Sequence, residues 1–454
     1  MDISKKSFLS AVVILLVLLI AAGFLTQVIP MGQYDYQIVE GKEVLIADSY
    51  HAFDGDRLPV YKWFTAPFDV LFADGSVIII MIIIFLMIIG GAIHLLNETH
   101  VLSTLIQSII DRFENKKKIL IYMITFIFMS MGALVGIFEE VVPLVPLMIA
   151  LSIALGYDLM MGLGMSVLAT GLGFAAAISN PFTIGVAQQL SGVTMFSGAG
   201  YRVIIFVCTY IILNIFLSLY GKRIYKAPST IDQFHVKGEK AAVLFFLVVI
   251  GLLGIMIALT PFVPLISSYN LPLIALLFLV AGIGCGLLSK EGIINTLTIM
   301  FKGSVNMLPA VILILIASGI KHLIQSGMIM DTILHEVSGL ITNNPPFVSV
   351  VIVYLLVLFL NFFIGSGSAK AFIVMPIIAP LMDMVGISRQ MGILAFQFGD
   401  GFSNILYPTN AVLLIALGLA GVSYGKWFKW ILKLQLVLVF MSLVFLAIGL
   451  LIRY

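Results

Sequence analysis

The sequence predicts an all-α polytopic membrane protein. Of its 454 residues, 61% are hydrophobic and 10% are charged, whereas an average soluble protein has about 25% charged residues. The mean hydropathy is +1.17. Apolar runs such as 11–25, 77–96 and 243–259 approach or reach the roughly 20 residues that a helix needs to cross about 30 Å of hydrocarbon. This composition excludes a soluble globular domain, and the net charge of +2 gives no reason to expect a nucleic-acid partner.

The first apolar run is expected to be a retained membrane span over residues 8–29. It is too long and too apolar for a cleaved signal peptide, and no small-residue cleavage site follows it. Lys5 and Lys6 precede this span and place the amino terminus in the cytoplasm, since Lys and Arg favour the inner face of the membrane. The span leads outward to a long loop of mixed charge, 31–73. We therefore expect a multi-pass protein of the cytoplasmic (inner) membrane, surrounded by lipid bilayer.

An internal repeat divides the chain into two halves, 1–235 and 236–454. A shift of 228 residues matches the halves up to the second span, and a shift of 230 matches them without a gap from the glutamate segment onward. The matched positions include Gly75 with Gly303, His94 with His322, Pro146 with Pro376, Gly171 with Gly401, and Asn180 with Asn410. Leucines match by chance in apolar sequences, but glycines, prolines and asparagines in one register indicate a true repeat.

The distribution of basic residues predicts how each half crosses the membrane. If residues 118–134 crossed completely, the basic loop 221–240 would face outward, against the positive-inside rule. A re-entrant helical hairpin over 118–156 keeps this loop in the cytoplasm, and the same reasoning makes 345–387 a second hairpin that enters from the outer face. The two repeats are then inverted, as in many secondary transporters, whose sites lie near the midplane. A bundle of complete spans is the alternative, but it needs more crossings and misplaces positive charge.

Each hairpin is followed by a helix that the sequence interrupts, over 158–195 and 389–423. Proline and glycine inside a span break the hydrogen-bond ladder, which is tolerated only where the backbone is buried in protein or lines a cavity. The polar residues at the two breaks are Ser179, Asn180, Thr183, Thr409 and Asn410. Such weakly charged oxygen ligands suit a coupling ion, which we expect to be sodium or a proton.

The predicted tip of the first hairpin holds two adjacent carboxylates, Glu139 and Glu140. The shift of 230 places Lys370, at the second tip, opposite Glu140. An ionised residue at bilayer depth costs roughly 2.5–3.5 kcal/mol, so such residues usually line a path or pair with one another. Glu140 and Lys370 either form an ion pair that locks the repeats or hold opposite ends of a substrate, and Glu139 has a separate role because adjacent helical residues diverge.

The second tip also contains Ser366, Gly367 and Ser368. Glycine lets the backbone approach a ligand closely, serine hydroxyls both donate and accept hydrogen bonds, and a helix that starts at the tip attracts a carboxylate. Asp400, near the second break, is a candidate cation ligand, proton carrier or contact for a substrate amine. Cys208 and Cys285 lie inside apolar runs, so no disulfide, metal site or cofactor is expected.

The breaks "SNPFTIGVAQ" (179–188) and "YPTNAVLL" (407–414), with the glycine-serine tip between them, resemble the YfcC-type family of the ion transporter superfamily. Carriers of four-carbon dicarboxylates and antiporters of arginine and ornithine are grouped with this family. The resemblance covers nearly the whole chain. It implies two inverted repeats, two hairpins, a homodimer built on scaffold helices, and elevator-like movement of a transport domain.

The first tip departs from the pattern of sodium–dicarboxylate members, which carry a serine-asparagine-threonine motif at each tip. Here Ile137, Phe138, Glu139 and Glu140 occupy it, and an acidic tip repels a dianion but attracts the cationic end of arginine, ornithine or lysine. We therefore expect a secondary transporter for a basic amino acid, either an antiporter or an ion-coupled carrier.

In this hypothesis Glu140 binds the positive group of the substrate, while Lys370, Ser366 and Ser368 bind its carboxylate. The main alternative is a sodium- or proton-coupled carrier of a carboxylate or dicarboxylate. A remote alternative is an intramembrane serine hydrolase that uses Lys370 as its base. The first tip has no matching serine, and the paired breaks have no use in hydrolysis, so we expect a transporter and not an enzyme.

Overall fold

The protein is built almost entirely from helices, as the sequence predicts. The computed structural model describes residues 5–454 except 40–41, 74–75, 114–115, 227–237, 261–262, 264 and 267–268. Within those residues, nine helices are long and apolar enough to cross a membrane. The expectation of an all-α polytopic membrane protein is confirmed. Gly75 and most of the basic loop 221–240, on which part of the repeat and orientation arguments rest, lie outside the described residues.

The first half of the chain contains α1 (Lys5–Val28), α2 (Tyr61–Asp69), α3 (Ser76–Glu98), α4 (Val101–Phe113), α5 (Lys117–Ser130), α6 (Val145–Ala154), α7 (Leu159–Leu163), α8 (Ala169–Ala175), α9 (Val186–Leu190) and α10 (Ala199–Ile224). Between them lie four short helical segments that are not α-helical. The segment η2 (Glu139–Leu144) is a 3-10 helix, and η1 (Met131–Val135), η3 (Gly164–Leu168) and η4 (Pro181–Gly185) are π-helices. The second half contains α11 (Lys240–Leu259), α13 (Asn270–Leu288), α14 (Ile293–Val305), α15 (Leu308–Ser326), α16 (Met330–Thr342), α17 (Pro346–Asn361), α18 (Gly367–Met384), α19 (Arg389–Ser403), α20 (Ala411–Ala420) and α21 (Tyr424–Leu451).

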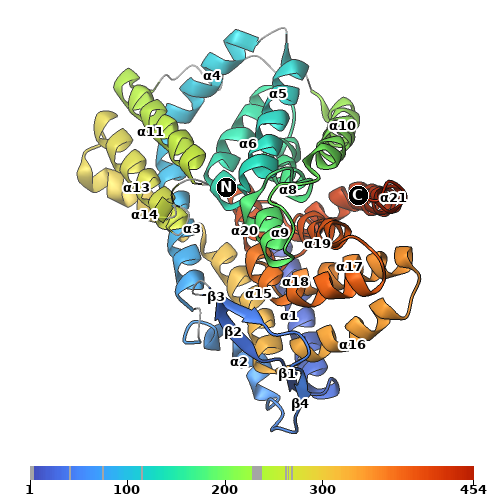
Figure 1. The fold of residues 1–454 in the computed structure, drawn as a ribbon. Helices are drawn as coiled ribbons and strands as arrows, with labels where there is room; N and C mark the ends of the chain where they lie inside the picture. The colour runs from blue at the N-terminus through green and yellow to red at the C-terminus, as the bar shows by residue number, and fades with distance from the viewer. Residues whose placement is uncertain are drawn as a thin grey trace.

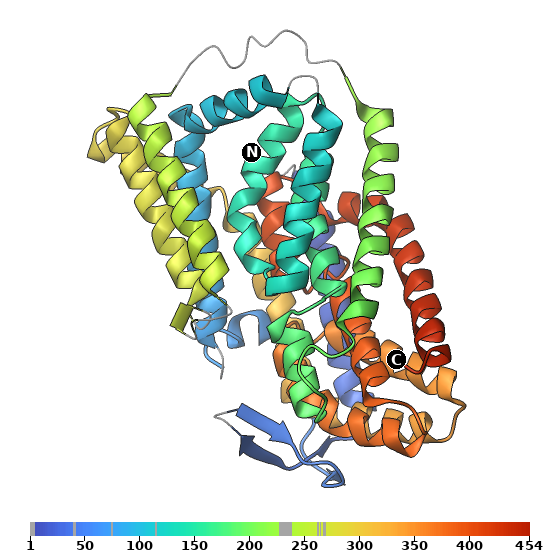
Figure 2. The ribbon, with the colours of Figure 1, turned by 45° about the horizontal axis from the view of Figure 1, so that its top comes forward.

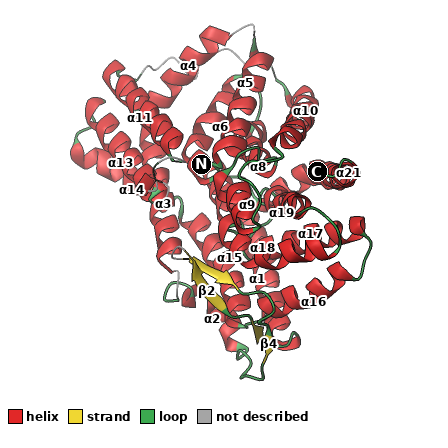
Figure 3. Ribbon diagram, viewed as in Figure 1, coloured by secondary structure: helices red, strands yellow, loops and turns green. Residues whose placement is uncertain are grey.

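Two groups of helices flank the hairpin segments, which lie between them. On one side of the molecule, α3 packs against α13 and α14, and α11 packs against α13. On the opposite side stand α10 and α21, the two longest helices of that edge (Figure 2). The segments around α6, α8, α18 and α19 lie between these sides, and the few strands sit together at one end (Figures 1 and 3). The central segments therefore have helices on both flanks.

The segment from α5 to α6 folds back on itself. At its start, the Lys117 ammonium lies 5.8 Å from the centre of the Tyr225 ring. At its end, the backbone N–H of Lys226 donates to the carbonyl of Gly156 at 3.0 Å. Both ends thus lie beside the C-terminal end of α10. The chain reverses near Gly136, whose φ of 80° is a left-handed conformation that glycine adopts without strain. Re-entrant placement of this hairpin in a bilayer stays a prediction.

The second fold-back joins α17 to α18, and both of its arms pack against α16. With 16 residues, α17 is about 24 Å long, which is shorter than the hydrocarbon core. The turn ends at Ser366, whose hydroxyl accepts a 3.3 Å hydrogen bond from the N–H of Ala369 and caps α18. This hairpin places Gly367 and Ser368 in the first turn of a long helix.

The two interrupted helices contact each other reciprocally. A Cβ added at Gly171 would lie 2.3 Å from Ile405, and one added at Gly401 would lie 2.3 Å from Ala175. The shift of 230 exchanges these two pairs. A two-fold relation between the halves produces such reciprocal contacts, whereas their inverted orientation in the membrane and the division at residue 235 stay predictions.

Helix starts also follow the repeat. Asp158 caps α7 by accepting from the N–H of Met161 at 3.0 Å. The residue 230 positions later, Ser388, caps α19 by accepting from Met391 at 3.3 Å. Capping by a side-chain oxygen satisfies one of the free N–H groups at a helix start. The same local chemistry thus begins the interrupted helix in each half.

The loop after α1 is ordered by four short strands, which the sequence did not reveal. They are β1 (Gly32–Gln33), β2 (Tyr36–Val39), β3 (Lys42–Leu45) and β4 (His51–Ala52), and they pair antiparallel as β1 with β4 and β2 with β3. This strand segment, residues 32–52, rests on α16, and β3 also packs against α18. The strands therefore connect the loop to the second hairpin.

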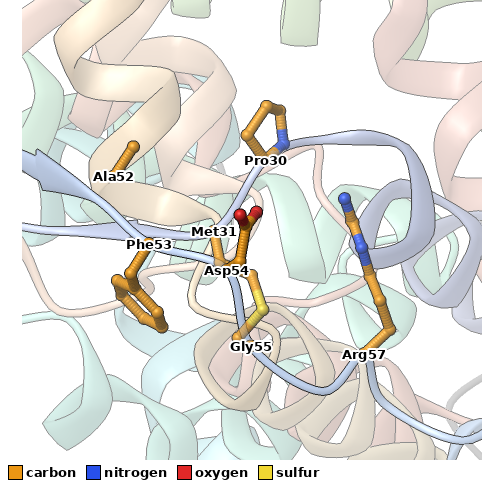
Figure 4. Close-up of a pocket in the computed structure, with 7 residues that line it drawn as sticks. All are labelled: Pro30, Met31, Ala52, Phe53, Asp54, Gly55 and Arg57. Atoms are coloured by element: carbon orange, nitrogen blue, oxygen red, sulfur yellow. The ribbon is translucent and has the colours of Figure 1, made fainter.

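A pocket of about 230 Å³ lies in this loop, and Figure 4 shows the residues that line it. Its lining includes Asp54 and Arg57. Arg57 is already engaged, since its guanidinium donates to the carbonyls of Thr26 at 2.9 Å and Ile29 at 2.7 Å, at the end of α1. We interpret Arg57 as a helix cap that anchors the loop, because cations are favourable near helix C-termini.

Candidate functional site

A completely buried ion pair forms at the second hairpin. The Lys370 ammonium lies 2.5 Å from Oδ1 of Asp400, and neither side chain is accessible. Lys370 also donates to the side-chain oxygen of Asn361, whose amide donates in turn to the hydroxyl of Ser403 at 2.7 Å. A charged pair needs such additional hydrogen bonds when it is withdrawn from water. The network joins the two arms of the second hairpin to α19.

The structure does not form the ion pair between Glu140 and Lys370 that the repeat register suggested. Lys370 takes Asp400 as its partner. Glu140 is buried and accepts instead from the amide of Asn270 at 2.6 Å and from the N–H of Phe138 at 3.2 Å. The register makes two residues equivalent within their own halves, but equivalence does not require contact. Lys370 is therefore neutralised within its own half.

The two glutamates of the first tip have opposite exposure. Glu140 is 5% exposed, whereas Glu139 is exposed. Both belong to η2, a 3-10 helix, in which successive side chains point about 120° apart because three residues make one turn. Glu139 is therefore the carboxylate that a solute can contact, and Glu140 lies buried behind it.

A second lysine, Lys321 of α15, reaches the hairpin tips. A Cβ added at Gly365 would lie 2.7 Å from the Lys321 ammonium. Lys321 interacts electrostatically with Glu139 and Lys370, is partly accessible, and has no hydrogen bond or ion pair within the described part of the chain. Sequence reasoning missed it because the repeat places Ile93 at the matching position. The available signal was a lone lysine inside an otherwise uncharged apolar helix.

The asparagines of the two breaks have equivalent roles. Asn180 caps η4 and accepts from the N–H groups of Phe182 at 2.9 Å and Thr183 at 3.3 Å. Asn410 caps α20 and accepts from the N–H of Leu413 at 3.1 Å. Each asparagine thus restarts its helix after the interruption, a structural role that its side-chain oxygen fulfils. This finding does not test the prediction that the two asparagines contact the substrate or a coupling ion, which stays a prediction.

Polar groups of the first break meet the second tip. A Cβ at Gly367 would lie 2.7 Å from the methyl group of Thr183 and 2.9 Å from Oδ2 of Asp400. The hydroxyl of Thr183 and Oδ2 of Asp400 are both buried and have no hydrogen-bond partner in the described structure. Buried polar atoms without partners are rare and call for an explanation. Gly367 thus lies beside two residues that each carry an unpartnered buried oxygen.

The remaining predicted residues lie near the turns, where Thr409 and Ser179 are hydrogen-bonded to backbone and Ser366 and Ser368 are accessible. The hydroxyl of Thr409 donates to the carbonyl of Phe362 at 2.6 Å, and that of Ser179 donates to the carbonyl of Leu134 at 3.2 Å. Each break is thereby fastened to the hairpin turn of its own half. Ser366 is exposed and Ser368 is partly exposed, so both hydroxyls remain open to a solute.

The accessible ionisable groups around the tips are of opposite sign. Lys370 and Asp400 cancel each other, and Glu140 is buried and hydrogen-bonded to Asn270. Glu139 and Lys321 remain accessible. A solute that carries both a cationic group and a carboxylate complements this pair, whereas a dianion is repelled by Glu139.

A polytopic helical chain with ionisable groups at two fold-backs has the architecture of a membrane transporter, and comparison with known proteins defines the class. The model of the C4-dicarboxylate anaerobic carrier family (DcuC) matches residues 8–451. The protein belongs to this family and is a membrane transporter rather than an enzyme.

Two curated proteins are similar over most of the chain. One, from Escherichia coli strain K12, is named "Putative basic amino acid antiporter YfcC"; it is 32% identical over 370 residues, which cover 77% of this chain and 73% of that protein. The other is an uncharacterized protein of Haemophilus influenzae, 25% identical over 384 residues that cover 80% of this chain and 74% of that protein. The expected resemblance to the YfcC type is confirmed.

Two solved transporter structures overlap weakly with the chain. The YdaH transporter of Alcanivorax borkumensis is 16% identical, with a TM-score of 0.44 and coverage of 98% of both chains. MtrF of Neisseria gonorrhoeae, described as illuminating a class of antimetabolite efflux pumps, is 17% identical, with a TM-score of 0.41 and coverage of 97% of this chain and 94% of that one.

Proposed function

We propose that the protein is a secondary active transporter of a basic amino acid, such as arginine, ornithine or lysine, across the cytoplasmic membrane. One observation carries the proposal: Glu139 presents an accessible carboxylate at the first tip, which attracts the cationic group of such a substrate. The name of the Escherichia coli relative, a basic amino acid antiporter, supports the same substrate class.

Glu139 receives the cationic side chain of the substrate, and Glu140, held by Asn270, supports the tip from its buried position. The second tip receives the substrate's carboxylate. Ser366 and Ser368 offer hydroxyl donors there, with their oxygens 3.3 Å apart, and the N-terminus of α18 adds free backbone N–H groups and a partial positive charge. Ser366, Ser368 and the N-terminus of α18 thus take the carboxylate-binding role that the sequence suggested for Lys370, because the Lys370 ammonium is paired with Asp400.

The coupling ion is proposed to act between the first break and the second tip. The unpartnered oxygens of Thr183 and Asp400 suit a sodium ion or a proton, both of which require oxygen atoms that are not already satisfied. Gly367 leaves the space next to them free of a side chain. Translocation then follows the elevator-like movement and homodimeric assembly that the resemblance implies.

A thermal-shift experiment on the purified full-length protein in detergent tests the substrate class. Arginine, ornithine and lysine should stabilise the protein by mass action, by about 2.7 kcal/mol at a concentration 100 times the dissociation constant. Glu139→Gln should weaken arginine binding by about 10- to 100-fold, because a hydrogen bond to a charged group contributes about 1.5–3 kcal/mol. Glu98→Gln, at an exposed glutamate on α3, serves as the matched control and should bind as the unchanged protein does.

The second candidate function is sodium- or proton-coupled transport of a carboxylate or dicarboxylate. The family's description and the unpaired Lys321 ammonium favour it. Succinate distinguishes the two in the same thermal-shift experiment, performed with and without sodium. Stabilisation by succinate but not by arginine would overturn the basic amino acid proposal and leave the transporter class intact.

A further inference from the structure

Lys321 is the one ionisable group near the tips that the proposed function leaves unassigned. Its ammonium lies against the backbone of Gly365 at the second tip. It remains partly accessible and has no hydrogen-bond or ion-pair partner among the residues that the structure describes. A cation withdrawn from bulk water without a partner is costly, and an incoming anion removes that cost.

The position of Lys321 in the fold separates it from the hairpins. It belongs to α15, which packs chiefly against α1 and α2, yet its side chain ends at the turn between α17 and α18. The other lysine of this region, Lys370, is held by Asp400. Lys321 is therefore the available positive charge beside the second tip, and Glu139 is the accessible carboxylate of the first tip.

We propose that Lys321 is the specificity-determining residue that selects substrates carrying a carboxylate. Its ammonium pairs with the α-carboxylate of the amino acid beside Ser366 and Ser368, while Glu139 holds the cationic end. This inference rests on the proposed function. It further means that a substrate is bound jointly by a hairpin tip and by a helix outside the hairpins, and that a diamine of the same length is rejected.

Arginine and its decarboxylated form, agmatine, test this directly, since agmatine retains the guanidinium and lacks the carboxylate. In titration calorimetry on the purified full-length protein, the wild type should bind arginine about 10- to 100-fold more tightly than agmatine, the range expected for a charge-assisted hydrogen bond. Lys321→Gln should lose this advantage by weakening arginine binding, and its agmatine affinity should stay within about two-fold of the wild type or rise, since a like charge has been removed.

Two further variants separate specificity from structure. Lys321→Arg retains the positive charge and should restore most of the preference for arginine. Lys302→Gln, at an exposed lysine on α14, should alter neither affinity. If Lys321→Gln kept the arginine preference, or lost arginine and agmatine binding equally, the role of Lys321 would be refuted while the proposed function stood. A wild-type protein that binds neither compound would overturn both.

Discussion

At the scale of single residues, the decisive feature is that the ionisable side chains at the tips differ in how strongly they are paired inside the protein. Lys370 and Asp400 neutralise each other in complete burial. Glu140 is buried and held by Asn270, whereas Glu139 and Lys321 remain accessible. Only groups without strong internal partners are free to bind a solute. In the proposed function the accessible pair, Glu139 and Lys321, contacts the substrate, whereas the buried pair, Lys370 and Asp400, stabilises the structure around it.

The buried pair predicts an asymmetric mutational result. Asp400→Asn leaves the Lys370 ammonium buried without a counter-charge and should lower the free energy of unfolding by about 3–5 kcal/mol. Replacing both residues, as in Lys370→Met with Asp400→Leu, should restore most of that loss, because apolar groups need no partner. Thermal unfolding in detergent measures both variants.

The half-exposed pair between Asp383 and Arg389, at 2.6 Å, supplies a control. Asp383→Asn should change stability by about 1 kcal/mol or less, because solvent screens exposed ion pairs. Equal losses in Asp400→Asn and Asp383→Asn would show that burial of the Lys370 pair has no special energetic role.

The sequence located most of these residues but not their partners. Glu139, Glu140, Lys370 and Asp400 stand out because charge is rare in apolar helices. Which of them touch depends on how helices far apart in sequence are rotated, and a repeat register carries no information on rotation. Lys321 was missed for a related reason: it has no charged equivalent in the first half.

At the scale of elements, the strand segment 32–52 and α16 form a polar junction. Asp331 accepts from the N–H of Tyr34 at 3.0 Å and from the hydroxyl of Tyr36 at 3.0 Å. The ring of Tyr50 stacks on that of His335, with centroids 3.9 Å apart. Strands of two to four residues are too short to show an alternating pattern, so the sequence indicated only a loop here.

This junction should respond to pH in a defined direction. Burial raises the pKa of Asp331, and burial together with the nearby Asp331 carboxylate raises the pKa of Tyr34 to about 12. Both groups hold protons more tightly when docked, so docking is strongest below the ordinary pKa of Asp331. It weakens as the pH rises through the raised pKa of Asp331, and again between about 10 and 12 as free Tyr34 ionises.

Spin labels on Gln37→Cys and Glu336→Cys, both exposed, measure this docking. The distance between the labels should stay short when the pH is lowered from 8 to 4. Asp331→Asn, which cannot ionise, should remove the dependence in the acidic range and leave the alkaline one. Separation of the labels on acidification would contradict the assigned direction.

At the scale of the whole molecule, the arrangement of the fold-backs determines which surfaces share a side of the membrane. Both ends of the α5–α6 segment lie beside the end of α10. The long apolar runs alone would have allowed a complete crossing by α5. Charge distribution in the sequence predicts a re-entrant hairpin instead, because it indicates on which side a loop remains, whereas hydropathy indicates only that a helix tolerates lipid. The re-entrant placement stays a prediction.

Cysteine labelling in intact cells tests this arrangement. Lys118→Cys and Lys226→Cys, both exposed, should react with a membrane-impermeant maleimide from the same side. Gln37→Cys, in the strand segment, should react from the opposite side. Labelling of positions 118 and 226 from opposite sides would mean that α5 crosses the bilayer, and the predicted re-entrant hairpin would be lost.

The reciprocal fit of the two interrupted helices limits how transport can proceed. No side chain can be accommodated at Gly171 or Gly401 without displacing the opposing half, so the seam between Gly171–Ile405 and Gly401–Ala175 has no room to slide. Interiors packed this closely transmit displacement rather than absorb it. We therefore expect the two tips to move together as one block relative to Lys321 and the surrounding helices.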